Sequence, residues 1–150
     1  MNELQAALKI ALSNTYVMYA KAQSYHWNVE GMFFAMFHDF FGDIYNELHG
    51  PIDELAERIR TLDGYAPISL MDILNSGTVP EDQVKPMTSS AMLSNLLLAN
   101  SVTIVSLNKA FEIADQQNNQ GLMDILAGRL DAHAKHAWMI KASLKSVGDQ

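Results

Sequence analysis

The sequence predicts an all-α protein, a bundle of four long helices with a short extra helix between the second and the third. Apolar residues recur at i, i+3 and i+4 in four long segments, the spacing of an amphipathic helix. A connection of 19 residues, Pro67 to Lys85, separates the second and third segments. It is long enough to cross the bundle, so these two helices are expected to run parallel. The 150 residues fit a single domain, 1–150, with a sizeable core.

The first two helices are predicted at residues 3–27 and 33–62, with a break at 28–31. Asp63-Gly64 ends the second helix, and we expect the glycine in the left-handed position that follows many helices. Pro51 lies inside this helix and predicts a kink just before Asp53. The predicted apolar stripe of the second helix contains Phe37, Phe40, Phe41, Ile44, Leu48, Ile52, Leu55, Ala56 and Ile59.

Three further helices are predicted after the second. Residues 69–74 predict a short helix within the connection, followed by a loop over 77–86. The third long helix is predicted over 89–117, capped by Thr88, Ser89 or Ser90. After a turn at 116–121, the fourth covers about 121–146.

Composition excludes several classes of function. The chain has no cysteine, so disulfides and thiolate metal sites are excluded. Its net charge is −7 and its ten Lys and Arg are scattered along the sequence. This charge pattern disfavours binding of nucleic acid and favours binding of cations. We see no secretory signal at the N-terminus and expect a cytoplasmic protein. The uncharged run between Lys85 and Lys109 carries many polar residues, which predicts a buried or interface helix and no membrane span.

Four residues form a candidate metal site. His26 and His38 are twelve residues apart, and Asp53 and Glu57 lie four apart on one face of the second helix. Imidazole with carboxylate suits non-haem iron, manganese or zinc. Taken singly, each histidine would be read as a packed core residue, and each acid as part of a solvated face. Their joint occurrence favours the metal.

The spacing also predicts where this site forms. His26 and His38 flank the break between two helices, so they are expected to be close together. Asp53 and Glu57 lie roughly 22–28 Å beyond His38 along the second helix, at 1.5 Å per residue. A single subunit therefore cannot bring all four together, and we predict a site shared by two subunits packed antiparallel around a two-fold axis.

The pattern resembles the ferroxidase signature of the Dps miniferritins, a ferritin-like family. That signature begins with His-Trp-Asn-Val-x-Gly-x-x-Phe. A second histidine follows twelve residues after the first histidine, and Asp-x-x-x-Glu begins twenty-seven residues after the first histidine. The resemblance covers nearly the whole chain, including His136, Trp138 and Met139 near its end. The matching signature residues are His26, Trp27, Asn28, Val29, Gly31, Phe34, His38, Asp53 and Glu57.

The resemblance implies a hollow dodecamer that oxidises Fe(II) with H2O2, O2 or both and stores ferric mineral inside. His26 and His38 would come from one subunit, and Asp53 and Glu57 from its partner. Trp27 would be a sacrificial electron donor; it is also readable as a core aromatic, and both can hold. The resemblance further implies a pore for iron at Asp124, with Asp131 a weaker candidate. Asp39 and Asp43 would nucleate mineral, although Gly42 breaks that acidic pattern.

Three other histidines have alternative interpretations. His49 lies one turn before Asp53, where it would add a ligand or a supporting contact, although a surface position near Pro51 is favoured. His133 and His136, at i and i+3, would chelate a metal or pack in the core, and packing is favoured.

Two further functions compete with ferroxidase activity. One is a DNA-condensing protein of the same family, which we do not expect because the end, Ser146 to Gln150, is not basic. The other is a structural oligomer with a zinc site, because zinc shares these ligands and can substitute for iron.

Overall fold

The computed structural model describes residues 1–145 and is helical throughout them, with no strand in that range. The predicted all-α bundle with a short extra helix is therefore confirmed. The elements are α1 (Glu3–Asn28), α2 (Phe34–Thr61), α3 (Leu70–Ser76), α4 (Ser89–Gln116) and α5 (Gln120–Leu144). The predicted boundaries agree to within about two residues, and the expectation for the end at 146–150 lies outside the described residues.

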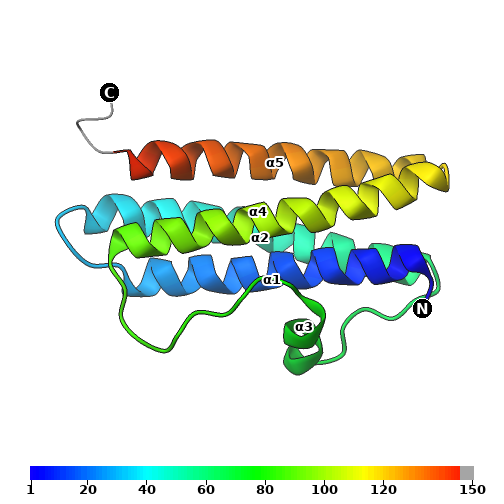
Figure 1. The fold of residues 1–150 in the computed structure, drawn as a ribbon, viewed down its shortest axis with the longest axis horizontal. Coiled ribbons are helices and arrows are strands. Elements are labelled where there is room, and N and C mark those ends of the chain that lie inside the picture. The colour runs from blue at the N-terminus through cyan, green and yellow to red at the C-terminus, as the bar shows by residue number, and fades with distance from the viewer. Residues whose placement is uncertain (146–150) are drawn as a thin grey trace.

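The chain forms two helical hairpins joined by a long crossing segment (Figure 1). α1 and α2 run antiparallel, and so do α4 and α5, while the segment carrying α3 returns from one end of the bundle to the other. α2 and α4 therefore run in the same direction, as predicted. α1 packs against both α2 and α4 and holds the two hairpins together.

The helix ends follow from local hydrogen bonding. Asn2 and Gln5 form a reciprocal capping box at the start of α1. Thr88, one of the three predicted caps, accepts a hydrogen bond from the Ala91 amide. α2 continues through Pro51.

The end of α2 corrects one prediction. Asp63, with φ 63°, takes the left-handed position, and Gly64 does not. Gly64 is required for a different reason, because a Cβ there would lie 2.9 Å from Cδ of Gln5. The Gln5 amide donates to the Leu62 carbonyl at 2.6 Å, which ties the start of α1 to the end of α2.

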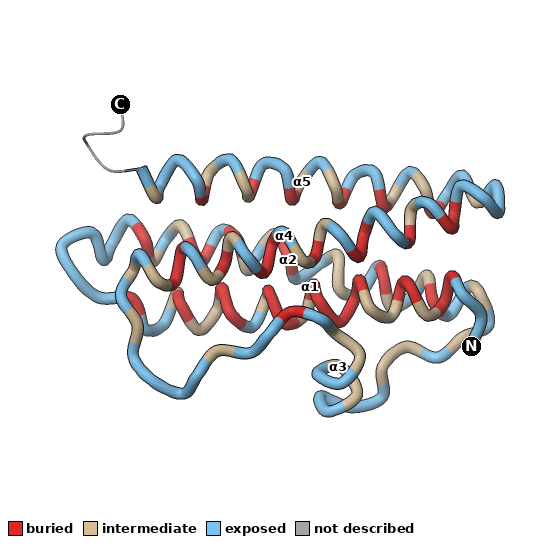
Figure 2. The backbone as a smooth tube through the Cα atoms, in the orientation of Figure 1, coloured by how far each residue is buried: buried red, intermediate tan, exposed pale blue. Residues whose placement is uncertain are grey.

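The core consists of two apolar halves separated by a polar layer (Figure 2 shows the buried, inward faces in red). One half contains Tyr25, Phe41, Leu96 and Ile140, and the other contains Leu8, Ile59, Ile113 and Leu126. Buried polar residues lie between them along three of the helices: Ser13, Asn14, Thr15, Asn100, Thr103, Ser106, Arg129, His133 and His136.

α4 is long and apolar enough to cross a membrane by length and composition. It packs against both α1 and α5 within the bundle. Its buried face carries Asn100, Thr103 and Ser106, whose polar groups are all hydrogen-bonded inside the bundle. These contacts agree with the expectation of a buried helix.

Candidate metal centre

The two predicted histidine ligands meet on the outer face of the α1–α2 hairpin. His26 lies in the last turns of α1, and His38 lies one turn into α2. The short turn between the helices, with Gly31 at φ 117°, brings them together. Their imidazole rings stack with centroids 3.7 Å apart and planes inclined by 18°. Spacing in the sequence therefore placed this pair correctly.

Two reciprocal hydrogen bonds fix which nitrogen of each histidine is available. Nδ1 of His26 lies 2.6 Å from the His38 carbonyl, and Nδ1 of His38 lies 2.6 Å from the His26 carbonyl. A carbonyl oxygen only accepts, so both Nδ1 atoms carry the proton. In a neutral ring the lone pair is then on Nε2, which has no hydrogen bond among the described residues. A backbone carbonyl that holds Nδ1–H is the support that orients many metal-binding histidines.

Gly42 makes room for this arrangement. A Cβ at position 42 would lie 3.0 Å from Nδ1 of His26 and 3.1 Å from its Cε1, so the imidazole would have to shift by a few tenths of an ångström to admit it. Two aromatic rings complete the surroundings. Tyr45 meets His26 edge-on at 5.3 Å, and Phe34 stacks on His38 at 5.1 Å. Gly42 therefore has a structural role in the site, beyond interrupting the acidic pattern.

The two predicted carboxylates lie far from the histidines in the same subunit. Asp53 and Glu57 are exposed on α2 and form no ion pair among the described residues. Asp53 is fifteen residues beyond His38, about 22 Å along a continuous helix. Within residues 1–145, no group of three or more His, Asp or Glu side chains is placed to hold a metal. The described chain thus carries the four predicted ligands as two separated pairs.

Trp27 follows His26 but is not a core aromatic, which corrects that alternative. Its side chain is 64% exposed. It forms no ring contact with another aromatic side chain in the part of the chain that the structure describes. An indole so accessible beside the histidine pair is open to solvent and to oxidants.

The acidic residues predicted for the pore and for mineral nucleation are all exposed. Asp39 and Asp43 follow His38 on α2, and Asp124 and Asp131 lie on α5, with Asp124 near its start. His49 is also exposed, as favoured, and its ring lies 5.8 Å from that of Tyr19. No described contact ties His49 to Asp53.

His133 and His136 pack in the bundle interior, the favoured alternative. Arg129 donates two hydrogen bonds to Glu47, at 2.5 and 2.9 Å, and a third to Nε2 of His133 at 3.2 Å. His136 donates from Nε2 to Glu47 at 2.6 Å. Nδ1 of His133 donates to the Asn100 side chain at 2.7 Å. We call these five residues the core network.

The core network shifts two pKa values. Burial, followed by the charge of Arg129, lowers the pKa of His133 to about 3, so its ring is neutral. Burial alone would raise the pKa of Glu47, but hydrogen bonds and charge from His136 and Arg129 outweigh it and lower this pKa to about 2. The imidazoles and the carboxylate are thus occupied by one another and by Arg129, and do not chelate a metal.

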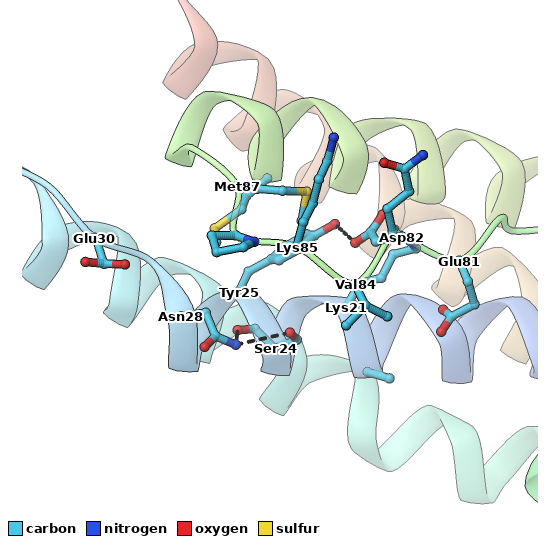
Figure 3. A pocket seen from close by; sticks show the side chains of 14 residues that line it. Lys21, Ser24, Tyr25, Asn28, Glu30, Glu81, Asp82, Val84, Lys85 and Met87 are labelled. Carbon is cyan, nitrogen blue, oxygen red and sulfur yellow. Dashed lines mark hydrogen bonds and ion pairs between the residues drawn. The ribbon is translucent and has the colours of Figure 1, made fainter.

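A pocket of about 530 Å³ between α1 and the crossing segment lies apart from these residues (Figure 3). Asp82 reaches from the segment toward α1, where it pairs with buried Lys21 at 2.8 Å and accepts a hydrogen bond from the Tyr25 hydroxyl. Burial and Asp82 together raise the pKa of Tyr25. Because Asp82 is already paired, we assign this cluster the role of anchoring the crossing segment to α1.

Sequence reasoning missed Tyr45 and Tyr19. Tyr45 contacts His26, and Tyr19 contacts Tyr45 with ring centroids 5.9 Å apart. A signal was present, because Tyr19 is seven residues before His26 and Tyr45 is seven after His38. Seven residues is two helical turns, so each tyrosine shares a face with its histidine.

Comparison with known proteins shows which family this fold belongs to. Residues 5–147 match the family model described as a ferritin-like domain. DNA protection during starvation protein 2 of Bacillus anthracis is 30% identical, over 85% of this chain and 87% of that protein. This chain superimposes on the Dps of Thermosynechococcus elongatus with a TM-score of 0.92 at 30% identity, covering 97% and 93% of the two chains.

A Vibrio cholerae Dps, described as a member of the ferritin-like diiron-carboxylate superfamily, superimposes with a TM-score of 0.90 at 29% identity. That alignment covers 95% of this chain and 89% of the other. Fold and family match together define a ferritin-like protein. Within that class the chain belongs to the Dps family of miniferritins, whose function is iron storage and protection.

Proposed function

We propose that this protein is a ferroxidase and iron store whose di-iron site forms between two subunits. His26 and His38 of one subunit would bind Fe(II) through Nε2, together with Asp53 and Glu57 of its partner. The observation that carries the proposal is the reciprocal pair of Nδ1–carbonyl bonds, which leaves both Nε2 lone pairs available on an outer face. The exposed carboxylates of Asp53 and Glu57, further along α2, complete the set.

The separation of the two half-sites supports a two-fold assembly. If two α1–α2 hairpins pack antiparallel, the histidines of each lie opposite the carboxylates of the other, and two equivalent sites result. We propose that such dimers assemble further into a hollow dodecamer, as the family resemblance implies.

Iron is the substrate at this site. The carboxylates of Asp53 and Glu57 offset the charge of the metal, which grows when Fe(II) becomes Fe(III). Two Fe(II) ions together supply the two electrons that reduce H2O2 to water, so no hydroxyl radical is released; O2 is the alternative oxidant. Exposed Trp27 is positioned to supply a missing electron. The product is stored as ferric mineral in the cavity.

Exposed acids extend the proposal to iron traffic. Asp124, with Asp131 further along α5, would line a pore that attracts Fe(II), and Asp39 and Asp43 would nucleate mineral. Zinc would occupy the same four ligands without redox chemistry, and would therefore inhibit oxidation.

A mixed-subunit experiment tests the shared site. One variant carries His26→Ala and His38→Ala, and the other carries Asp53→Ala and Glu57→Ala. Each alone is expected to oxidise no iron at the site. Oligomers formed by refolding the two together contain interfaces with one intact site and should regain part of the activity. Assembled mixed oligomers that remain inactive would refute the shared site.

An anaerobic Fe(II) titration tests the stoichiometry and the oxidant. Binding should saturate near about two Fe(II) per subunit, as a two-metal site requires. Adding H2O2 or O2 and following the ferric absorbance then shows which oxidant reacts faster. Zinc added beforehand should block the reaction. Saturable zinc binding with no iron oxidation would instead favour the structural zinc site.

DNA protection is the second candidate, because the Bacillus anthracis relative is a DNA protection during starvation protein. The charges of this chain disfavour it. Seventeen Asp and Glu outnumber ten Lys and Arg. Three of those cations, Lys9, Lys21 and Arg129, are already paired with carboxylates. We infer that iron chemistry, in a cytoplasmic protein, is the main activity.

A further inference from the structure

The core network has the make-up of a metal site, with a guanidinium at its centre. Glu47 comes from α2, and His133 and His136 come from one face of α5. Imidazole and carboxylate side chains on facing helices are the ligands from which metal sites inside helix bundles are built. Arg129 donates to Glu47 and to His133, and His136 donates to the same Glu47 oxygen, so the three side chains meet at one place.

A single terminal nitrogen of Arg129 lies between the ligand atoms. Its Nη2 is 2.9 Å from Oε1 of Glu47 and 3.2 Å from Nε2 of His133, and Nε2 of His136 is 2.6 Å from that same Oε1. Bonds from zinc to such atoms are about 2.0–2.2 Å long, so each ligand lies about 1 Å too far from Nη2 to bind a metal there. This spacing agrees with the lack of a ready metal-holding group within residues 1–145. The ligands are spaced for hydrogen bonds to a nitrogen cation.

His133 is oriented as a metal-binding histidine is. Its Nδ1 donates to Oδ1 of Asn100 at 2.7 Å, and the Asn100 amide donates to the His133 main-chain carbonyl at 2.9 Å. With the proton on Nδ1, the lone pair is on Nε2, where Arg129 donates. A hydrogen bond of this kind on Nδ1 fixes the tautomer and direction of many metal-binding histidines. Burial lowers the pKa of His133 to about 3, and the neutral imidazole is the form that binds metal.

Arg129 is a permanent cation whose hydrogen bonding is incomplete. Its side chain is buried, and a guanidinium is not deprotonated in proteins. Its Nε–H is buried with no hydrogen-bond partner among the described residues. A buried donor without a partner costs free energy, so hydrogen bonding alone does not account for a guanidinium at this position. The Glu47 side chain is 35% exposed, which opens the cluster to solvent and to dissolved ions on one side.

We propose that the core network is a latent site for a divalent transition metal, and that Arg129 keeps metal out of the bundle interior by taking the place of the ion. The ligands are Glu47, His133 and His136. A divalent ion that enters while Arg129 is present meets a like charge at close range. Without Arg129, one carboxylate and two imidazoles surround the vacated space and can close on a metal. The inference stands apart from the proposed ferroxidase function, because it concerns other residues and needs no oxidation of iron.

The test uses the full-length chain with His26→Ala and His38→Ala, which removes the histidines of the outer face. In this background Arg129→Ala should gain one tightly bound Co(II) per subunit, seen as the visible absorption of Co(II) with nitrogen and oxygen ligands. Zinc should displace the cobalt and should raise the thermal unfolding temperature of this variant. The background protein, which retains Arg129, should show neither effect.

Further substitutions on top of Arg129→Ala identify the ligands. His133→Ala or Glu47→Gln should abolish the Co(II) absorption. Asn100→Ala should lower the affinity for Co(II) about 10–100-fold, because the His133 ring loses the contact that orients it. His49→Ala is the matched control, because His49 is an exposed histidine of α2 outside the core network, and its removal should leave Co(II) binding unchanged.

Arg129→Lys tests the charge itself. Lysine keeps a cation on the same turn of α5, so this variant should bind no Co(II). Arg129→Gln, of similar length and without charge, replaces Arg129→Ala if the alanine variant does not fold, and it carries the same expectation. The proposal is overturned if a folded variant without a cation at position 129 binds no more Co(II) than the background. It is also overturned if binding persists without His133, if Arg129→Lys binds as tightly as Arg129→Ala, or if neither neutral variant folds in the presence of zinc.

Discussion

Replacing Gly42 with alanine should weaken metal binding while leaving the fold intact. The added methyl group would lie 3.0 Å from Nδ1 of His26, so the imidazole must move by a few tenths of an ångström. That movement stretches the 2.6 Å bond from Nδ1 to the His38 carbonyl. It also disturbs the 3.7 Å stack between the two rings. Both contacts determine where Nε2 points.

The magnitude follows from these contacts. One hydrogen bond contributes about 0.5–1.5 kcal/mol to stability, and alanine in a helix interior gains about 1 kcal/mol over glycine. The two effects offset each other, so the free energy of unfolding should change little. Loss of a contact that orients a metal ligand typically lowers affinity about 10–100-fold. We expect a fall of this size for zinc, or for Fe(II) under anaerobic conditions.

Gly128→Ala is the control, because Gly128 lies in α5 with nothing within 4 Å of an added Cβ. Isothermal titration calorimetry of the parent and the two variants, with thermal unfolding measured in parallel, separates affinity from stability. Unchanged metal affinity in Gly42→Ala, where His26→Ala abolishes binding, would refute the role given to Gly42.

Three further predictions concern stability, site geometry and DNA. First, folding lowers the pKa of His133 from 6.5 to about 3. As the pH falls, the His133 ring of the unfolded chain therefore takes up a proton before that of the folded chain. Stability should therefore fall with acidification between these values, by up to about 1.4 kcal/mol per pH unit, and His133→Gln should flatten that dependence in denaturant titrations at fixed protein concentration. Glu47, whose pKa falls from 4.5 to about 2, adds a loss confined to lower pH. Second, Pro51→Ala supplies an N–H to the Glu47 carbonyl and should not lower thermal stability, yet iron affinity should fall if the proline aims Asp53; equal affinity would remove Pro51 from the site. Third, at pH 7.5 with a chelator, plasmid DNA should show no gel shift, because each subunit carries −7; a retarded band that salt weakens would contradict this.

The sequence was informative wherever spacing alone decides geometry. Helical periodicity located the four long helices of residues 1–145, and the short break after His26 implied that His38 would lie beside it. Four-residue spacing placed Asp53 and Glu57 on one helical face. These inferences need only the rise and pitch of an α-helix, which hardly vary between proteins.

Features that depend on how two helices face each other were out of reach. Gly42 was read as a gap in an acidic pattern, whereas its importance lies in the ring of His26 across the interface. Gly64 was expected to supply a left-handed turn, but Asp63 does so, and Gly64 instead admits the Gln5 side chain. A glycine shows in sequence that a Cβ is absent, and only the packed structure shows what occupies the space.

The interior of the bundle explains why iron chemistry would belong on its outer face. Glu47, His133 and His136 are metal-ligand types gathered in the core. The guanidinium of Arg129 donates to both Glu47 oxygens and to Nε2 of His133. His136 donates to the same Glu47 carboxylate. Removing Arg129 would leave the half-buried Glu47 carboxylate with His136 as its one remaining hydrogen-bond partner among the described residues. The core ligands are therefore committed to stability. On the outer face, by contrast, the Nε2 atoms of His26 and His38 remain available, and the carboxylates they would need lie too far along α2 to come from the same chain.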